Sequence, residues 1–188
     1  MIRDAARTVF KAEGLEGSSL RAIAAEAGYT PAALYAHFDS KEALYAEVLE
    51  DSLGRLTASI TQAGSTAGTP NARLHAAAMA FFDFYAENPS DLDLGFYLFR
   101  GGMKPQGLGK ERDQVLNQAL ARALKPISEA AANIGVAPEE ANLLVVEIFA
   151  HAAGLLLLTH TGRIRIFDAA APDLMERYIT EKINILTS

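Results

Sequence analysis

Residues 18–41 read SSLRAIAAEAGYTPAALYAHFDSK, and this stretch decides the fold of the N-terminal part of the chain. The opening serine pair is suited to cap a helix over LRAIAAEA, because a hydroxyl oxygen accepts from the free amides of a first turn. Gly28 ends that helix, since glycine adopts the positive φ of a C-terminal cap at little cost. Thr30 followed by Pro31 starts a second helix, PAALYAHF. The stretch therefore predicts two short helices joined by a tight turn.

Apolar residues in this stretch have the spacing needed to hold the two helices together. The positions that would lie between them are Ile23, Ala27, Tyr29 and Leu34, with the small Ala24 at the crossing point. A helix, a three-residue turn containing glycine and a second helix form the helix-turn-helix pattern, whose second helix enters the major groove of DNA. The alternative is a two-helix piece of some other all-α core.

The residues around this pattern resemble the DNA-binding domain of the TetR/AcrR family of bacterial one-component regulators. The resemblance runs from Ile2 to about Ala46 and rests on Ala5, Ala6, Phe10, Gly14, Arg21, Ile23, Ala24, Ala27, Gly28, Leu34, Tyr35, His37, Phe38, Ser40, Lys41, Glu42 and Leu44. It implies a three-helix DNA-binding domain in residues 1–45. It also implies that residues 46–188 form a helical domain that binds a ligand and dimerises.

The resemblance further implies which side chains meet operator DNA. Residues expected to face base edges are Arg21, Pro31, Ala32, Ala33 and Tyr35, and those expected to hold phosphates are Ser19, Tyr35, His37 and Lys41. The second helix offers few hydrogen-bonding groups, so direct readout would depend on Arg21, on Thr30 and on methyl contacts of alanine with thymine. DNA shape would then carry part of the specificity. For Tyr35 and His37 the alternative role is packing within the small domain.

Charge argues mildly against DNA binding. The chain has a net charge of −6, and residues 1–45 hold 5 Lys/Arg against 6 Asp/Glu, a net charge of −1. A domain that holds phosphates usually has a basic face. We therefore expect a modest, salt-dependent affinity that relies on dimerisation. The charge also keeps open an alternative, a small-molecule-binding or interaction protein on the same scaffold with weak or lost DNA binding.

Helical periodicity and helix-ending residues continue through the rest of the chain. The helices expected along the whole sequence are about 2–13, 20–27, 31–38, 40–63, 70–87, 91–99, 110–133, 138–160 and 172–186. Asp39 and Glu42 have the spacing of a capping box, and Pro126 is expected to kink or split its helix. No stretch of useful length alternates as a strand would. The fold prediction is all-α, with about nine helices.

Aromatic and polar residues of the C-terminal part are candidates for a ligand pocket. The set comprises Met79, Phe82, Tyr85, Phe96, Arg100, Asn117, Phe149 and His151. In the family that this chain resembles, the C-terminal domain commonly binds a small, often hydrophobic effector. Aromatic residues at helical spacing are usually core, so plain packing is the alternative for each of them.

The helices near 138–160 and 172–186 would expose a large apolar surface in a monomer, which soluble proteins avoid. In the family that the chain resembles, a four-helix interface between two copies covers such helices. We therefore expect a homodimer, and a charge introduced at Leu156 or Ile179 is expected to break it.

Other classes of function find little support in the sequence. There are no cysteines, and the histidines at 37, 75, 151 and 160 lack ligand spacing, so no metal or other cofactor is expected. No catalytic arrangement stands out, which argues against an enzyme. The N-terminus does not resemble a signal peptide, and the segment after Glu147 contains histidines. We expect a cytoplasmic protein without a membrane span.

Overall fold

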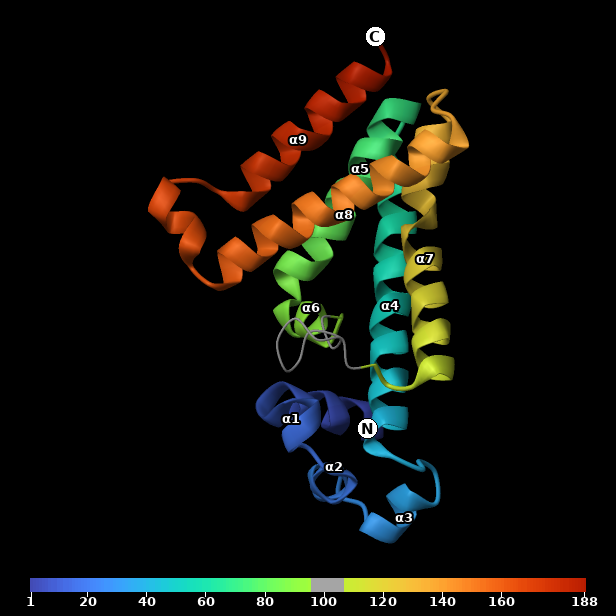
Figure 1. The fold of residues 1–188 in the computed structure, drawn as a ribbon, viewed down its shortest axis with the longest axis vertical. Helices are drawn as coiled ribbons and strands as arrows, with labels where there is room; N and C mark the ends of the chain where they lie inside the picture. The colour runs from blue at the N-terminus through green and yellow to red at the C-terminus, as the bar shows by residue number, and fades with distance from the viewer. Residues whose placement is uncertain (96–106) are drawn as a thin grey trace. The chain divides into compact units, whose positions relative to one another are not determined.

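The computed structural model describes residues 1–95 and 107–188 of the chain. These residues form nine α-helices and one 3-10 helix without any strand, so the predicted all-α fold is confirmed (Figure 1). The elements are α1 (Ile2–Gly17), α2 (Leu20–Glu26), α3 (Pro31–Tyr35), α4 (Lys41–Thr66), α5 (Pro70–Glu87), α6 (Pro89–Gly95), α7 (Lys110–Ala132), α8 (Pro138–His160), η2 (Arg163–Phe167) and α9 (Ala171–Leu186).

Two compact units divide the chain. Unit 1 contains Met1–Leu53 and Ser90–Ala119, and unit 2 contains Gly54–Pro89 and Leu120–Ser188. Two long helices, α4 and α7, contribute residues to both units. The domain border expected after residue 45 falls inside α4, and it remains a prediction.

Unit 1 is built around the contact of α1 with the first turns of α4. The ring of Phe10 meets the ring of Tyr45 edge-on, with 4.8 Å between centroids, and both side chains are fully buried. The Tyr45 hydroxyl donates to the carbonyl of Leu94 in α6 at 3.0 Å. This bond satisfies a polar group that burial would otherwise leave without a partner. Within unit 1, α6 is thereby fixed against α4.

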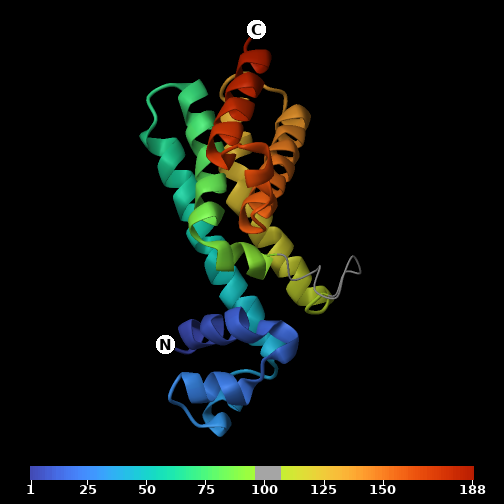
Figure 2. The same ribbon diagram turned by 90° about the vertical axis from the view of Figure 1, so that its left-hand side faces the viewer.

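Unit 2 is centred on α5, which contacts both α8 and α9, while α8 and α9 also contact each other. The ring of Phe81 in α5 lies 5.4 Å from that of Tyr85 and 5.5 Å from that of Phe149 in α8. Figure 2 shows α5 running back beside the C-terminal part of α4. A Cβ at Gly64 would lie 3.7 Å from the Cβ of Ala77, an ordinary contact distance, so α4 and α5 pack closely at this point.

Several helix ends differ from the sequence-based expectation. Helix α3 ends at Tyr35 rather than at 38, and α6 begins at Pro89, while the residues expected to complete it at 96–99 lie outside the described part of the chain. The N-cap of α4 is Ser40, whose Oγ accepts from the Ala43 amide at 3.1 Å, and not Asp39. Ser40 caps the Ala43 amide, one residue after the Glu42 amide that a cap at Asp39 would serve. Helix α4 therefore begins at Lys41.

Pro126 does not split α7, which continues as one helix from Lys110 to Ala132. A proline inside a helix removes one hydrogen bond and costs about 3 kcal/mol. Here the buried stripe passes the proline without a break, because Ala123, Ile127 and Ala131 are all fully buried. Packing on both sides of Pro126 outweighs the local cost.

Helix α8 is the helix among residues 1–95 and 107–188 that is long and apolar enough to cross a membrane, and 33% of its most apolar window is buried. Leu156 of α8 and Ile179 of α9 are 1% and 2% exposed within unit 2. The expectation that a charge at either residue would act on a dimer seam is therefore wrong, because both side chains belong to the core of the protein's own unit. The exposed apolar residues of α8 are others: Leu143, Val146 and Leu157.

Candidate nucleic-acid interface

The start of α2 is fixed by one serine of the predicted pair. Ser19 Oγ accepts from the Ala22 amide at 3.1 Å and caps the helix as expected. Ser18 does not cap it, since this residue is buried and its Oγ donates to the Leu15 carbonyl at 2.8 Å. Both hydroxyls therefore stabilise the connection from α1 to α2, at opposite sides of it.

Between α2 and α3 the chain makes the tight turn that the sequence predicts. Gly28 has φ +71°, its amide donates to the Ala25 carbonyl at 3.2 Å, and the Tyr29 amide donates to the Ala24 carbonyl at 2.9 Å. These two bonds form a Schellman motif, which satisfies the last carbonyls of α2. No atom lies within 4 Å of a Cβ built at Gly28, so the backbone conformation alone requires glycine there.

Thr30 and Pro31 start α3 in the predicted manner. Thr30 Oγ1 accepts from the Ala33 amide at 3.2 Å, and Pro31 occupies the first turn. After Tyr35 the chain leaves the helix, although the amides of His37 and Phe38 still donate to the Leu34 carbonyl at 3.0 and 2.9 Å. The part of α3 that is able to face a groove is therefore short.

Three of the five residues expected at the crossing of α2 and α3 are buried. Ile23, Ala24 and Leu34 are fully buried and Ala27 is half-buried, whereas Tyr29 is 43% exposed and does not close the pair as expected. The left-handed backbone at Gly28 changes the chain direction before Tyr29, so helical spacing no longer predicts the direction of its side chain. Leu20, at 4% exposure, supplies the missing apolar contact surface.

Every residue expected to meet DNA is at least partly accessible to solvent. The exposed members are Ser19, Arg21, Thr30, Ala32, Tyr35 and His37, and the half-buried ones are Pro31, Ala33 and Lys41. Tyr35 is 59% exposed, which does not fit the alternative role of packing. The contacts of these residues with DNA remain a prediction.

Lys41 has a structural partner that the sequence did not indicate. Its Nζ donates to the carbonyls of Glu16 and Ser18, at 3.1 and 3.4 Å. The side chain thus ties the first turn of α4 to the connection between α1 and α2. An ammonium has three donors, so a phosphate contact remains compatible with these two bonds.

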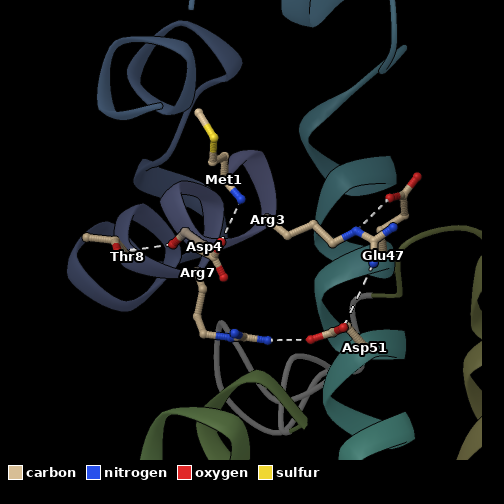
Figure 3. A network of polar contacts seen from close by, with 7 residues as sticks. All are labelled: Met1, Arg3, Asp4, Arg7, Thr8, Glu47 and Asp51. Carbon is tan, nitrogen blue, oxygen red and sulfur yellow. Dashed lines mark hydrogen bonds and ion pairs between the residues drawn. The ribbon is translucent and has the colours of Figure 1, made fainter. Parts of the chain in front are cut away.

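Two arginines of α1 form ion pairs with acidic residues of α4 (Figure 3). Arg7 Nη2 lies 2.9 Å from Asp51 Oδ2, while Arg3 lies 3.5 Å from Glu47 and 3.8 Å from Asp51. These pairs add polar contacts between α1 and α4 to the aromatic contact of Phe10 with Tyr45. No sequence pattern indicated them, because the partners are more than forty residues apart.

The ion pairs change how the charge of residues 1–45 is distributed. Of the five basic residues there, Arg3 and Arg7 are paired with carboxylates and Lys41 is bonded to carbonyls. Arg21 is exposed at the second position of α2, and it forms no ion pair with any residue in the described part of the chain. Arg21 is therefore the best placed cation for a contact with DNA.

Beside Tyr29 and His37, unit 1 has an open hollow of about 710 Å³. Its lining also includes Arg3, Glu47 and Asp51, which are the charged groups of the ion pairs just described. Because these charges are already compensated, the hollow offers no uncompensated charge to a ligand.

Comparison with known proteins agrees with this arrangement. A family model described as bacterial regulatory proteins of the tetR family matches residues 2–48, the part of the chain that contains α1, α2, α3 and the start of α4. Residues 2–48 therefore resemble the DNA-binding part of the tetR family of bacterial regulatory proteins.

Two curated proteins similar to this chain come from Mycolicibacterium smegmatis. The HTH-type transcriptional activator FasR is 40% identical over 80 residues, which cover 43% of this chain and 36% of that protein. The HTH-type transcriptional repressor KstR2 is 40% identical over 78 residues, which cover 42% of this chain and 38% of that protein. The chain thus matches less than two fifths of the length of either curated relative.

The fold of the chain is shared over its full length with a solved structure. The transcriptional regulator FadR from Bacillus subtilis, in complex with stearoyl-CoA, has a TM-score of 0.70 and 17% identity. The superposition covers 100% of this chain and 96% of FadR. An identity this low shows a common fold alone.

The residues expected to line a ligand pocket are distributed unevenly. Five belong to unit 2: Phe82 and Tyr85 are buried at 1% and 5% exposure, and Met79, Phe149 and His151 are half-buried. Asn117 is exposed on α7 and belongs to unit 1. Phe96 and Arg100 lie outside the described residues. The aromatic group around α5 and α8 is therefore the part of the expected pocket that the structure brings together.

His151 joins α8 to α9 through a cluster that the sequence did not indicate. Its ring stacks on Tyr178, whose hydroxyl lies 3.5 Å from Glu147 Oε2, and Lys182 forms an ion pair with the same carboxylate. The His151 Nε2 atom is buried without a hydrogen-bond partner. Burial lowers the pKa of His151 and raises the pKa of Tyr178.

Proposed function

We propose that this chain is a dimeric, cytoplasmic transcriptional regulator of the TetR family, a repressor that a small hydrophobic ligand releases from its operator. The observation that supports this proposal is the helix-turn-helix of α2 and α3. Its inner residues Ile23, Ala24 and Leu34 are fully buried, while the predicted DNA contacts are all exposed or half-buried. An arrangement of this kind is typical of a helix pair that enters the major groove.

On DNA, α3 would supply close apolar contact and α2 the charged reading group. Arg21 is able to form two hydrogen bonds with a guanine edge, and the methyl group of Ala32 suits a thymine methyl. The phosphates on either side would meet Ser19, His37 and the remaining donor of Lys41. Since α3 offers few hydrogen-bonding groups, sequence-dependent shape would add to the specificity.

The exposed apolar face of α8 supports the dimer. Leu143, Val146 and Leu157 are 64%, 63% and 60% exposed, although all three are large apolar side chains. Val146 is three and Leu157 fourteen positions after Leu143, so helical geometry puts all three side chains on one face of α8, with the small, exposed Ala150 and Gly154 between them. Burying this apolar stripe against a second copy removes it from water.

The ligand class to test first follows from a structural neighbour. The Bacillus subtilis FadR is described in complex with stearoyl-CoA. In this chain, a long acyl group would lie near the aromatic residues of α5 and α8, where Phe149 and Met79 are only half-buried. To release DNA, the ligand must bind the DNA-incompetent conformation more tightly than the competent one.

A gel-shift titration with the DNA upstream of the protein's own gene tests the proposal, with and without stearoyl-CoA. We expect a specific shift that weakens as salt rises and disappears when the ligand is added. A reporter gene under the same DNA should be expressed more strongly when the regulator is deleted.

The second candidate function is a small-molecule-binding or interaction protein that does not read DNA. It is favoured because three of the five basic residues within 1–45 already bind groups of the protein itself: Arg3 and Arg7 pair with carboxylates, and Lys41 donates to carbonyls. This candidate predicts that the ligand raises the melting temperature while specific and random DNA bind equally weakly.

A further inference from the structure

The segment that joins α8 to α9 exposes two large apolar side chains. In η2, Ile164 is 7% exposed and holds the segment against the protein, whereas Ile166 and Phe167 are 76% and 72% exposed. Two arginines, Arg163 and Arg165, are exposed beside them. We call residues 163–167 the basic tip. Figure 1 shows it at the end of α8 opposite Pro138.

Backbone geometry holds the basic tip in place. Gly162 before it has φ 71°, and Asp168 after it has φ 49°, the one positive φ of a non-glycine residue among residues 1–95 and 107–188. A non-glycine residue in this region costs about 1–2 kcal/mol and persists where the surrounding structure requires it. The two ends and the buried Ile164 thus fix the direction in which Ile166 and Phe167 point.

The opposite end of α8 has the complementary charge. Glu139 and Glu140 are exposed in the first turn, followed by the exposed Leu143. We call Glu139, Glu140 and Leu143 the acidic start. The same helix therefore begins with carboxylates beside an apolar side chain and ends at guanidinium groups beside apolar side chains.

The exposed stripe of α8 is symmetric about its middle. Leu143 and Leu157 are both seven residues from Ala150, and the central residues Ala150 and Gly154 are small and exposed. Small residues at the centre of a face allow two helices to approach closely. A two-fold axis near Ala150 would place Leu143 of one copy opposite Leu157 of the other.

Charge decides between the two ways in which such copies are able to pair. If the two α8 helices ran parallel, each acidic start would meet an acidic start and each basic tip a basic tip. If they run antiparallel, each basic tip meets an acidic start, and the helix dipoles oppose each other as well. The antiparallel pairing is the one in which opposite charges meet at both ends.

We propose that the occupant of the basic tip is a second copy of this chain. In the homodimer of the proposed function, on which this inference rests, the tip of each copy docks on the acidic start of its partner's α8. Arg163 and Arg165 pair with Glu139 and Glu140, while Ile166 and Phe167 cover the apolar side chains beside them. Arg163 follows Leu157 by six residues, and the last turn of α8 ends between them at His160, so the tip lies beyond the point where Leu157 meets Leu143.

A charge-swap experiment on the full chain tests this inference. Variant A carries Arg163→Glu and Arg165→Glu, and variant B carries Glu139→Arg and Glu140→Arg. Each homodimer then has like charges at both contacts, and we expect its dissociation constant in sedimentation equilibrium to rise at least tenfold. In a mixture of A and B opposite charges meet again at both ends, and we expect heterodimers as tight as the unmodified dimer.

A matched control changes the same amount of charge elsewhere in unit 2. Arg122→Glu with Lys125→Glu reverses two exposed cations of α7, and it should leave the dimer unchanged. If A and B dimerise as tightly as the control, the tip inference is overturned while the dimer of the proposed function stands. A monomeric unmodified chain would overturn both.

The absence of cysteine from the chain allows a second measurement that does not depend on charge. Chains with Leu143→Cys and chains with Leu157→Cys are oxidised separately and as a mixture. The antiparallel pairing predicts disulfide-linked dimers in the mixture and few in either variant alone. Efficient cross-linking of each variant with itself would mean parallel helices and would overturn the inference.

Discussion

The imidazole ring of His151 lies flat on the phenol ring of Tyr178, with 4.0 Å between centroids and 12° between planes. Burial lowers the pKa of His151 below its ordinary value, and a hydrogen bond with the backbone of Leu174 opposes this only in part. The neighbouring charges, Glu147 and Lys182, are paired with each other. The neutral imidazole is therefore the form that suits the contact between α8 and α9.

This contact predicts a pH dependence with a definite sign. As the folded-state pKa lies below that of the unfolded chain, the unfolded chain binds the proton first, and stability falls as pH drops below about 6.5. His151→Phe keeps a stacked ring without a proton site. Between pH 7.5 and 5.5 we expect the unmodified chain to lose more unfolding free energy than this variant, by urea titration at each pH. Parallel losses in both would assign the dependence to other groups.

The ion pairs between α1 and α4 should contribute measurably to stability. Arg7 is 25% exposed and bonds to Asp51 at 2.9 Å, so Arg7→Met is expected to cost about 1 kcal/mol. The matched control is Arg3→Met, which removes longer contacts of a residue that is 58% exposed and should cost less than about 0.5 kcal/mol. In 1 M salt the difference between the two variants should shrink. An equal loss of unfolding free energy in the two variants would mean that the burial of Arg7 does not strengthen its ion pair with Asp51.

Two basic residues of the candidate interface should separate base reading from positioning. Arg21→Ala is expected to weaken binding to the operator by about 1–3 kcal/mol and to reduce the preference over random DNA. Lys41→Ala is expected to weaken all DNA alike, to lower the salt slope by about one per subunit and to reduce stability, because it also removes the bonds to Glu16 and Ser18. Lys125→Ala serves as the control. If Arg21→Ala and Lys41→Ala each weaken binding to operator and to random DNA by the same amount, Arg21 reads no base.

Phe82 should now behave as a core residue. It is 1% exposed, so Phe82→Ala is expected to cost about 3–5 kcal/mol and to lower DNA binding through partial unfolding. Phe149 is half-buried, and Phe149→Ala should weaken a hydrophobic ligand with a smaller loss of stability. Thermal melts with and without stearoyl-CoA measure both effects. A ligand-induced rise in melting temperature that Phe149→Ala leaves unchanged would place the ligand elsewhere.

Neighbouring leucines of α8 should respond differently to a charge. Leu157 is 60% exposed, so Leu157→Glu should leave the monomer folded and weaken the dimer by roughly 3 kcal/mol, on the order of a hundredfold in Kd. Leu156 is 1% exposed, so Leu156→Glu should unfold unit 2 instead. Sedimentation and far-UV circular dichroism separate the two outcomes. A folded, dimeric Leu157→Glu variant would contradict the use of this face.

The sequence by itself determined the features that depend on near neighbours. The caps at Ser19 and Thr30 and the glycine turn at Gly28 lie where the sequence predicts them, because each depends on bonds within three or four residues. Helical periodicity likewise predicted the all-α fold and the long helices. Where two neighbouring residues are able to cap, as at Asp39 and Ser40, the spacing favoured Asp39, whereas the structure uses Ser40.

Only the tertiary structure decided the relations between residues distant in the chain. Lys41 bonds to carbonyls more than twenty residues earlier, and Arg7 meets Asp51 forty-four residues later. Which apolar residues of α8 are buried was equally undecided, because a helix that is apolar on all sides has no periodicity to mark its inner face. Packing against α5 and α9 buries Leu156 and leaves Leu157 exposed, and no pattern along the sequence distinguishes these two leucines.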